Sequence, residues 1–93
     1  MSNVVLLYHP NTEDEVFVRD ITYNYKHQTG RELPLISLDS VEGAEIAKLY
    51  GIERYPAIVA RTDYGDMIHL WQADELPMVQ EIAFYDHSEQ KAF

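Results

Sequence analysis

The chain is organised around residues 50–59, which read Tyr-Gly-Ile-Glu-Arg-Tyr-Pro-Ala-Ile-Val. Gly51 predicts the end of a helix, because glycine readily adopts the left-handed backbone conformation found at helix C-termini. Pro56 precedes an unbroken apolar run, residues 57–60, which predicts a strand buried on both faces. This stretch therefore joins a helix to a central strand through a short loop that contains proline.

The remaining segments alternate between short apolar runs and longer helical ones. Strands are predicted at residues 4–8, 33–38, 57–60 and 67–71, and helices at about 13–28, 41–50 and 75–85. The order β-α-β-α-β-β-α predicts an α/β domain whose four-stranded mixed sheet runs second, first, third, fourth strand, with helices on both faces. Pro34 cannot donate to a ladder, which places the second strand at an edge.

Local signals set the expected ends and buried faces of the helices. Thr12 and Glu15 have the spacing of a capping box, in which a hydroxyl and a carboxylate each accept a backbone amide. Further caps, stops and turn residues are expected at Gly30, Asp39, Ser40, Gly51, Gly65 and Asp74, with Pro77 in the first turn of the last helix. The apolar residues expected on the buried faces are Phe17, Val18, Ile21, Tyr25, Ile46, Ala47, Leu49, Tyr50, Met78, Ile82 and Tyr85. Gly43 lies inside the second helix and costs up to about 1 kcal/mol against alanine, so this helix is expected to be the least stable.

The composition predicts a single acidic domain. The 93 residues are 46% hydrophobic, which is enough for a packed core without metal or disulfide bonds. Residues 4–85 are expected to form this core, and residues 86–93 a flexible tail. Sixteen acidic against seven basic residues give a net charge of −9, which argues against a nucleic acid or an anionic membrane as partner. A basic partner surface is favoured.

The sequence contains no cysteine, which excludes disulfides, thiol nucleophiles and cysteine metal sites. Residues 1–3 carry no basic group, and the apolar run after them is five residues long. Neither a signal peptide nor a membrane span is expected, and the cytoplasm is the default location.

The stretch at residues 50–59 resembles the thioredoxin-like fold in the short form that glutaredoxins also use. Thioredoxins have a helix that ends in Tyr-Gly-Ile or Tyr-Gly-Val, then a cis-proline, an apolar strand and a hairpin with glycine. Residues 50–52, Pro56, residues 58–59 and Gly65 follow in matching order and spacing. The resemblance covers residues 4 to about 85 and implies a cis Tyr55–Pro56 peptide bond.

The chain departs from this family at the turn between the first strand and the first helix, where the family carries Cys-x-x-Cys. Two alignments of residues 9–16 remain open. One places Thr12 and Glu15 at the cysteine positions, and the other places Glu13 and Val16 there. Neither alignment supplies the sulfur that thiol–disulfide exchange requires.

The other chemistry of the fold family is also unsupported. The buried acid that thioredoxins keep on the first strand falls near Leu7. Tyr8 or Thr12 would be the hydroxyl if the chain resembled glutathione transferases, which share the fold in their first domain. These 93 residues do not include a helical second domain, however, and the nearby acids are expected to repel an anionic thiol. The chain is therefore expected to be redox-inactive and not an enzyme.

No cofactor or metal site is expected. The carboxylates beside Thr12 are better explained as a solvated helix start, because successive side chains on a helix do not converge on one point. The histidines share no metal-binding spacing. They lie at His9, His27, His69 and His87.

The remaining hypothesis is a binding groove on the side of Pro56. In thioredoxin-like proteins the residue before the cis-proline offers its backbone to an extended peptide, which pairs like a strand. The groove residues predicted here are His9, Asn11, Thr12, Glu13, Asp14, Tyr55 and Pro56. The expected function is a protein- or peptide-binding or assembly module. The alternatives are a small subunit that self-associates through the fourth strand with Met67, His69 and Trp71, and a glutathione-binding protein.

Overall fold

A computed structural model describes residues 4–62 and 64–86 of the chain. Along these residues the elements are β1 (Val4–Tyr8), α1 (Asp14–Thr29), β2 (Leu35–Ser37), α2 (Val41–Tyr50), β3 (Ala57–Arg61), β4 (Met67–Trp71) and α3 (Val79–Asp86). The predicted order is confirmed, and the chain is an α/β protein. Of the expected tail, Asp86 is the last residue of α3, and residues 87–93 lie outside the described part.

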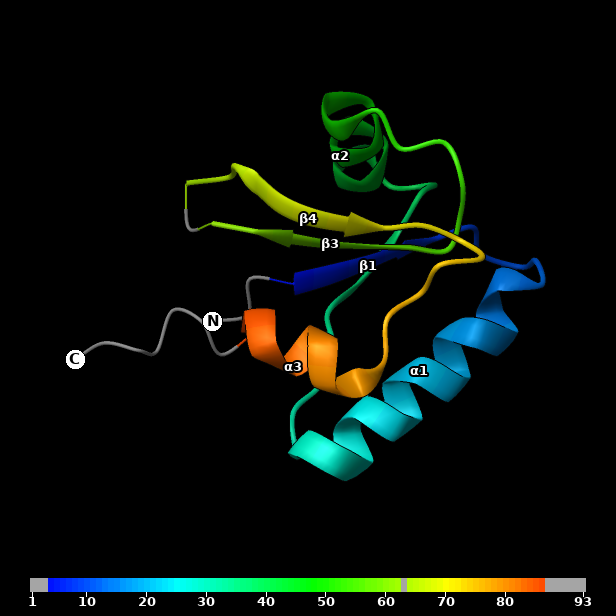
Figure 1. Cartoon of the computed structure of the whole chain (residues 1–93). Coiled ribbons are helices and arrows are strands. Elements are labelled where there is room, and N and C mark those ends of the chain that lie inside the picture. The colour runs from blue at the N-terminus through cyan, green and yellow to red at the C-terminus, as the bar shows by residue number, and fades with distance from the viewer. Residues whose placement is uncertain (1–3, 63, 87–93) are drawn as a thin grey trace.

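The four described strands form one mixed sheet in the order β2-β1-β3-β4, as predicted. β1 pairs with β2 in parallel and with β3 antiparallel, so Leu6 lies opposite both Leu35 and Ile58. β3 pairs antiparallel with β4. Figure 1 shows α2 on one face of the sheet and α1 with α3 on the other.

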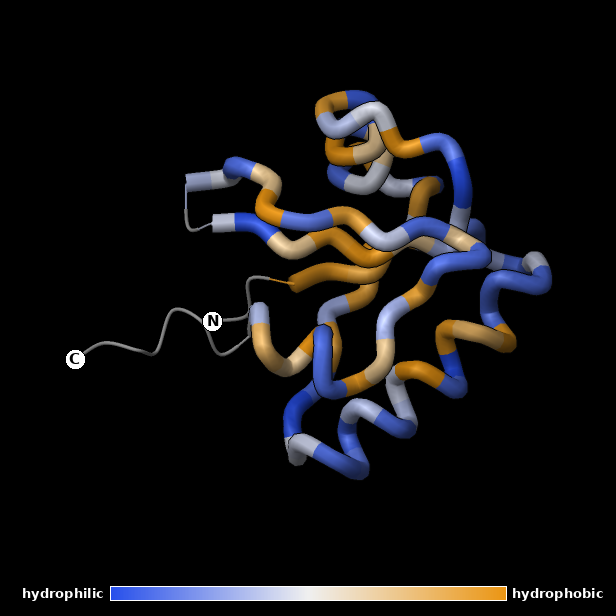
Figure 2. The backbone as a smooth tube through the Cα atoms, in the orientation of Figure 1, coloured by the Kyte–Doolittle hydropathy of each residue, from blue (hydrophilic) through white to orange (hydrophobic). Residues whose placement is uncertain are grey.

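Two apolar clusters hold the helices to the sheet, because successive residues of a strand face opposite sides. Val4 and Leu6 of β1 point to the cluster under α1 and α3, which includes Tyr25 and Ile82. The next residues along β1 and β3 point to the cluster under α2. That cluster consists of Val5, Leu7, Ile46, Ile52, Ala57 and Val59. The central strands are accordingly the most hydrophobic part of the chain in Figure 2.

The predicted helix stops are confirmed. Gly30 and Gly51 end α1 and α2 with φ of 75° and 64°, and the amide of each donates to a carbonyl of the last helical turn. Ser40 is the N-cap of α2, where its hydroxyl accepts from the amide of Gly43 at 3.0 Å. The hairpin glycine, Gly65, also has a positive φ, at 94°.

The structure explains why position 43 is a glycine, which the sequence did not reveal. A Cβ on this residue would lie 2.1 Å from the carbonyl oxygen of Ser37. This distance is far below any normal contact, so α2 reaches the end of β2 only because position 43 carries no side chain.

Three residues expected on buried helix faces are exposed: Phe17, Leu49 and Met78. Phe17 is about 100° around α1 from its buried neighbour Val18, so it falls outside the line that packs on the sheet. Leu49 similarly lies off the line that Gly43, Ile46 and Tyr50 define on α2. Met78 precedes α3 and does not belong to the helix. Val18, Tyr25, Ile46 and Ile82 are buried as predicted.

The start of α3 was predicted wrongly. Asp74 has a left-handed backbone, with φ of 82°, and lies in a turn closed by the amide of Glu75 on the carbonyl of Gln72 at 2.9 Å. It therefore cannot lead directly into a helix, and Pro77 precedes α3. β2 is also shorter than predicted, although its edge position is as expected.

Candidate functional site

The turn between β1 and α1 is built by hydrogen bonds that differ from the predicted capping box. α1 begins at Asp14, and its N-cap residue Glu13 makes no side-chain capping bond. The Thr12 hydroxyl accepts from the amide of Asp14 at 3.2 Å, and not from that of Glu15. The capping box is therefore wrong. Asn11 adopts a left-handed conformation, with φ of 63°, and the Glu15 carboxylate accepts from its amide and not from that of Thr12.

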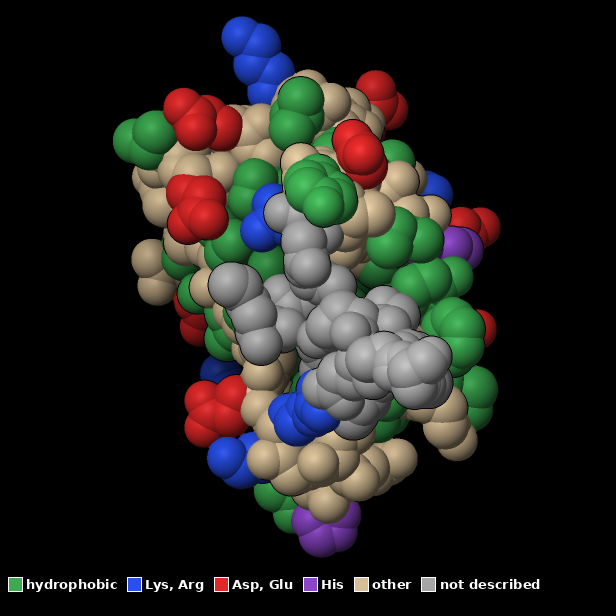
Figure 3. Space-filling view, turned by 90° about the vertical axis from the view of Figure 1, so that its left-hand side faces the viewer, with side chains coloured by type: hydrophobic (Ala, Val, Ile, Leu, Met, Phe, Trp, Pro, Cys, Tyr) green, Lys and Arg blue, Asp and Glu red, His purple; other side chains and the backbone are tan. Residues whose placement is uncertain are grey.

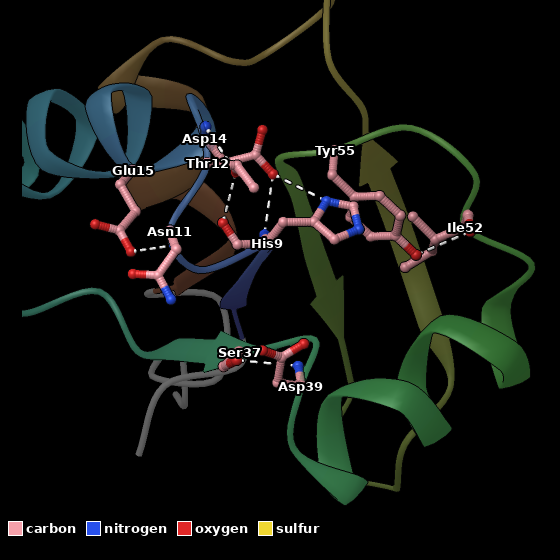
Figure 4. Close-up of polar contacts among 9 residues, drawn as sticks. All are labelled: His9, Asn11, Thr12, Asp14, Glu15, Ser37, Asp39, Ile52 and Tyr55. Carbon is pink, nitrogen blue, oxygen red and sulfur yellow. Dashed lines mark hydrogen bonds and ion pairs between the residues drawn. The ribbon is translucent and has the colours of Figure 1, made fainter.

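Two carboxylates of α1 instead hold the backbone of the turn. Asp14 Oδ2 accepts from the amide of His9 at 2.9 Å, and Glu15 Oε2 accepts from the amide of Asn11 at 2.7 Å. The Thr12 hydroxyl donates to the carbonyl of His9 at 2.7 Å. Each of these polar side chains reaches back over the turn, so the turn is tied to the first residues of the helix (Figure 4).

His9 connects this turn to the loop before β3. Its Nδ1 lies 3.2 Å from Asp14 Oδ2, and its ring meets the Tyr55 ring edge-on with centroids 4.9 Å apart. The side chain of His9 is 51% exposed and that of Asp14 is 16% exposed, so the carboxylate is shielded while the imidazole remains open to solvent. The two segments therefore form one continuous surface.

Tyr55 is fixed within its loop. Its hydroxyl donates to the carbonyl of Ile52 at 2.9 Å, and partial burial raises the pKa of the phenol. The Tyr55–Pro56 peptide bond is cis, as expected, and Pro56 is buried at the start of β3. Tyr55 rather than Pro56 thus contributes side-chain surface beside His9.

Gln72 is a structural residue of the site that the sequence did not indicate. Its Oε1 accepts from the amides of Glu53 and Arg54, at 3.1 and 3.2 Å. Arg54 Nη1 also lies 3.6 Å from Asp74 Oδ2. The segment after β4 therefore holds the loop before Pro56. A glutamine after a strand carries no sequence signal that would have identified this role.

The structure thus brings together one part of the predicted groove. Asp14, His9 and Tyr55 form a chain of contacts between the turn and the loop, and the buried Pro56 follows Tyr55. The remaining predicted residues, Asn11, Thr12 and Glu13, are exposed on the turn. Their turn is linked to the loop through His9.

Hydroxyl chemistry at Thr12 is disfavoured by these contacts. The hydroxyl donates to the carbonyl of His9 and accepts from the amide of Asp14, so both its hydrogen and its oxygen are used in hydrogen bonds within the turn. Tyr8, the other hydroxyl considered, packs against the core beneath α1. Leu7, near which the resemblance would place a buried acid, is completely buried among apolar side chains.

Within residues 4–62 and 64–86, no three His, Asp or Glu side chains are arranged to hold a metal ion. None of the helices formed by these residues has the length and hydrophobicity that crossing a bilayer requires. No protein-family model matches the chain, and a search of the curated proteins found no significant match.

Proposed function

We propose that this chain is a redox-inactive thioredoxin-like domain that binds an extended protein or peptide segment in the groove between the β1–α1 turn and Tyr55. The element order, the strand order and the cis bond before β3 support the family assignment. α1 begins with Glu13 as N-cap and Val16 in its first turn, which favours the second alignment of the missing Cys-x-x-Cys.

The contact between His9 and Tyr55 carries the binding proposal. These residues come from segments far apart in the sequence, yet their rings meet at 4.9 Å. The Asp14 carboxylate, 3.2 Å from His9 Nδ1, and the carbonyl of Ile52, which accepts from the Tyr55 hydroxyl, hold the two rings in place. A surface that is held in place before binding loses little conformational entropy when a ligand is added, which favours affinity.

The charge of the groove selects a basic partner. Glu13 is exposed at the N-cap of α1 without a capping bond, and Asp14 and Glu15 follow it. The whole chain carries a net charge of −9. A basic peptide would be attracted to this turn, and its association would weaken with increasing salt.

The groove is proposed as a binding site and not as a catalytic one. The sequence has no cysteine, so no thiolate can attack a disulfide. The Thr12 hydroxyl is engaged with backbone groups on both sides.

An array of short peptides of varied charge tests the proposal. We expect the bound peptides to be basic, and we expect binding to fall with Tyr55→Ala and with Glu13→Lys. Glu42→Lys on α2 is the matched control, since it makes the same charge change away from the groove. Peptides that bind all three variants as tightly as the parent protein would place the interface elsewhere.

Self-association through β4 is a second candidate, because β4 is an edge strand of the described sheet. It contains no Lys, Arg, Asp, Glu or Pro, the residues that normally protect an edge from pairing, and its Met67 and Ile68 are exposed. Size-exclusion chromatography with light scattering should then show a dimer that Ile68→Lys dissociates. A monomer at every concentration would exclude this candidate.

A further inference from the structure

A hollow of about 330 Å³ lies between β4 and α3. Its lining residues are His69, Trp71, Gln80, Glu81, Phe84 and Tyr85, none of which belongs to the proposed peptide groove. The volume lies at the lower end of the range for small-molecule sites, about 300–1,000 Å³. In the space-filling view, hydrophobic side chains gather along one side of the molecule next to a histidine (Figure 3).

Aromatic rings dominate the walls of this hollow. The His69 and Trp71 rings lie 4.4 Å apart, and the Tyr85 ring meets Trp71 at 5.3 Å and 72°. The Phe84 ring stands at 88° to the Tyr85 ring, 5.2 Å away. The Tyr85 ring is steeply inclined to those of Trp71 and Phe84, whereas the His69 ring is tilted by only 37° to Trp71 and 36° to Tyr85, so the cluster presents both ring faces and ring edges. Ring faces carry the negative end of the aromatic quadrupole.

The side chains at the bottom of the hollow are packed into the core, and a side chain at its edge is exposed to solvent. Trp71 is only 8% exposed and belongs to the core cluster, and Tyr85 packs against the same cluster. Phe84 is 69% exposed on α3. A ligand would therefore meet a preformed aromatic surface that it does not have to order.

The polar side of the hollow is anionic. Glu81 lines it, and the amide of Met78 donates to Glu81 Oε1 at 3.1 Å, which holds the carboxylate at the start of α3. Gln80 is the neutral neighbour, and none of the described lining residues is Lys or Arg. Aromatic faces beside a carboxylate attract an organic cation, whose charge interacts with both.

We propose that the hollow between β4 and α3 binds an organic cation, an alkylated ammonium or a guanidinium group. An anion would be repelled by Glu81 and by the acidic chain. A small hydrated metal ion would find a single carboxylate, that of Glu81, among the described lining side chains, whereas Ca²⁺ takes about six to eight oxygen ligands. The cation belongs either to a free small molecule or to a modified or basic side chain of a partner.

Trp71 is the only tryptophan of the chain and reports directly on this site. Titration of the whole chain with tetramethylammonium chloride should give a saturable change in tryptophan fluorescence. Potassium chloride at equal ionic strength and tert-butanol, a neutral molecule of similar shape, should not. Equal saturation by tert-butanol would overturn the proposal, because the hollow would then select apolar shape and not charge.

Two substitutions test how an aromatic ring and the carboxylate of the hollow contribute to binding. Phe84→Ala removes an exposed ring, and we expect about fivefold weaker binding of tetramethylammonium. Glu81→Gln removes the charge but keeps an oxygen for the Met78 amide, and should weaken binding by a similar factor. The matched controls on α2 are Leu49→Ala and Glu42→Gln, both expected to bind like the parent protein. Circular dichroism should show that all four variants are folded.

The source of the cation follows from a comparison of probes. A peptide with one trimethyllysine between glycines should bind at least tenfold more tightly than tetramethylammonium if the cation is a partner's side chain. Equal or weaker binding of the peptide indicates a free cation. Tyr55→Ala should leave both titrations unchanged, because the groove is a separate site. The absence of a saturable signal with any cation, or an equal loss in Glu81→Gln and Glu42→Gln, would refute the proposed site.

Discussion

Replacement of Gly43 by alanine should destabilise the protein, although alanine is the better helix former. The new Cβ would lie 2.1 Å from the carbonyl oxygen of Ser37 and 3.1 Å from the hydroxyl oxygen of Ser40. The Ser37 contact involves backbone, so α2 would have to move away from the end of β2 by about 1 Å to reach a tolerable distance. That movement would also strain the capping bond between Gly43 and Ser40.

The change in the free energy of unfolding is the sum of two unfavourable contributions and one favourable contribution. Overpacking costs about 1–3 kcal/mol, and a weakened N-cap about 1 kcal/mol more. The higher helix propensity of alanine stabilises the folded state by about 1 kcal/mol. We therefore expect Gly43→Ala to lower the free energy of unfolding by about 1–3 kcal/mol, and Tm by several degrees.

Urea and thermal denaturation, followed by circular dichroism and by Trp71 fluorescence, measure this difference. Ala44→Gly is the control on the exposed side of α2, where propensity alone applies and the expected loss is about 1 kcal/mol. A Gly43→Ala variant as stable as the parent protein would show that α2 does not approach β2 as closely as described.

Three further changes test other parts of the structure. Gln72→Ala should speed hydrogen exchange at the amides of Glu53 and Arg54, because both donate to the lost side chain; unchanged exchange would contradict the role of Gln72 in holding the loop. Burial raises the pKa of Tyr55 above its ordinary value of 10.0, so the folded state keeps this proton longer than the unfolded state does. Its contribution to stability should be complete below pH 10 and be lost as the pH rises further; Tyr55→Phe should lose less stability than the parent protein between pH 9 and 11, and parallel curves would contradict the shift. Ile82→Ala should cost about 2–5 kcal/mol in urea denaturation, since the side chain is fully buried beneath α3, and a loss below 1 kcal/mol would contradict that packing.

The element order could be predicted because it follows from local signals, and the strand order because it follows from the element order through general rules for connecting strands. Apolar runs mark β1 and β3, and glycines mark the ends of α1 and α2. Left-handed residues accompany both errors in helix starts, since Asn11 and Asp74 are the only described residues other than glycine with positive φ. Asp74 is expected as an N-cap, but Asp caps helices and also adopts the left-handed conformation, and the sequence does not distinguish these uses. At the first helix the expected cap is Thr12, and the left-handed conformation of the preceding Asn11 has no sequence signal.

The candidate sites were less accessible from the sequence. The proximity of His9 to Tyr55 followed from the expected topology, whereas their edge-on contact depends on side-chain packing. Gln72 holds the loop before β3, and the hollow beside Glu81 forms where β4 and α3 meet in three dimensions. The spacing of residues along the sequence does not indicate such contacts.

The two faces of the sheet are covered unequally by helices, so we expect local unfolding to begin at the face that carries fewer helices. One face carries the two helices α1 and α3, and the other carries α2 alone (Figure 1). Detachment of α2 would expose Val5 and Val59 while the opposite face stays packed. The same event would free Ile52, whose carbonyl holds the Tyr55 hydroxyl. Amides of α2 should therefore exchange with solvent before those of α1, and a ligand that locks Tyr55 in place should slow them.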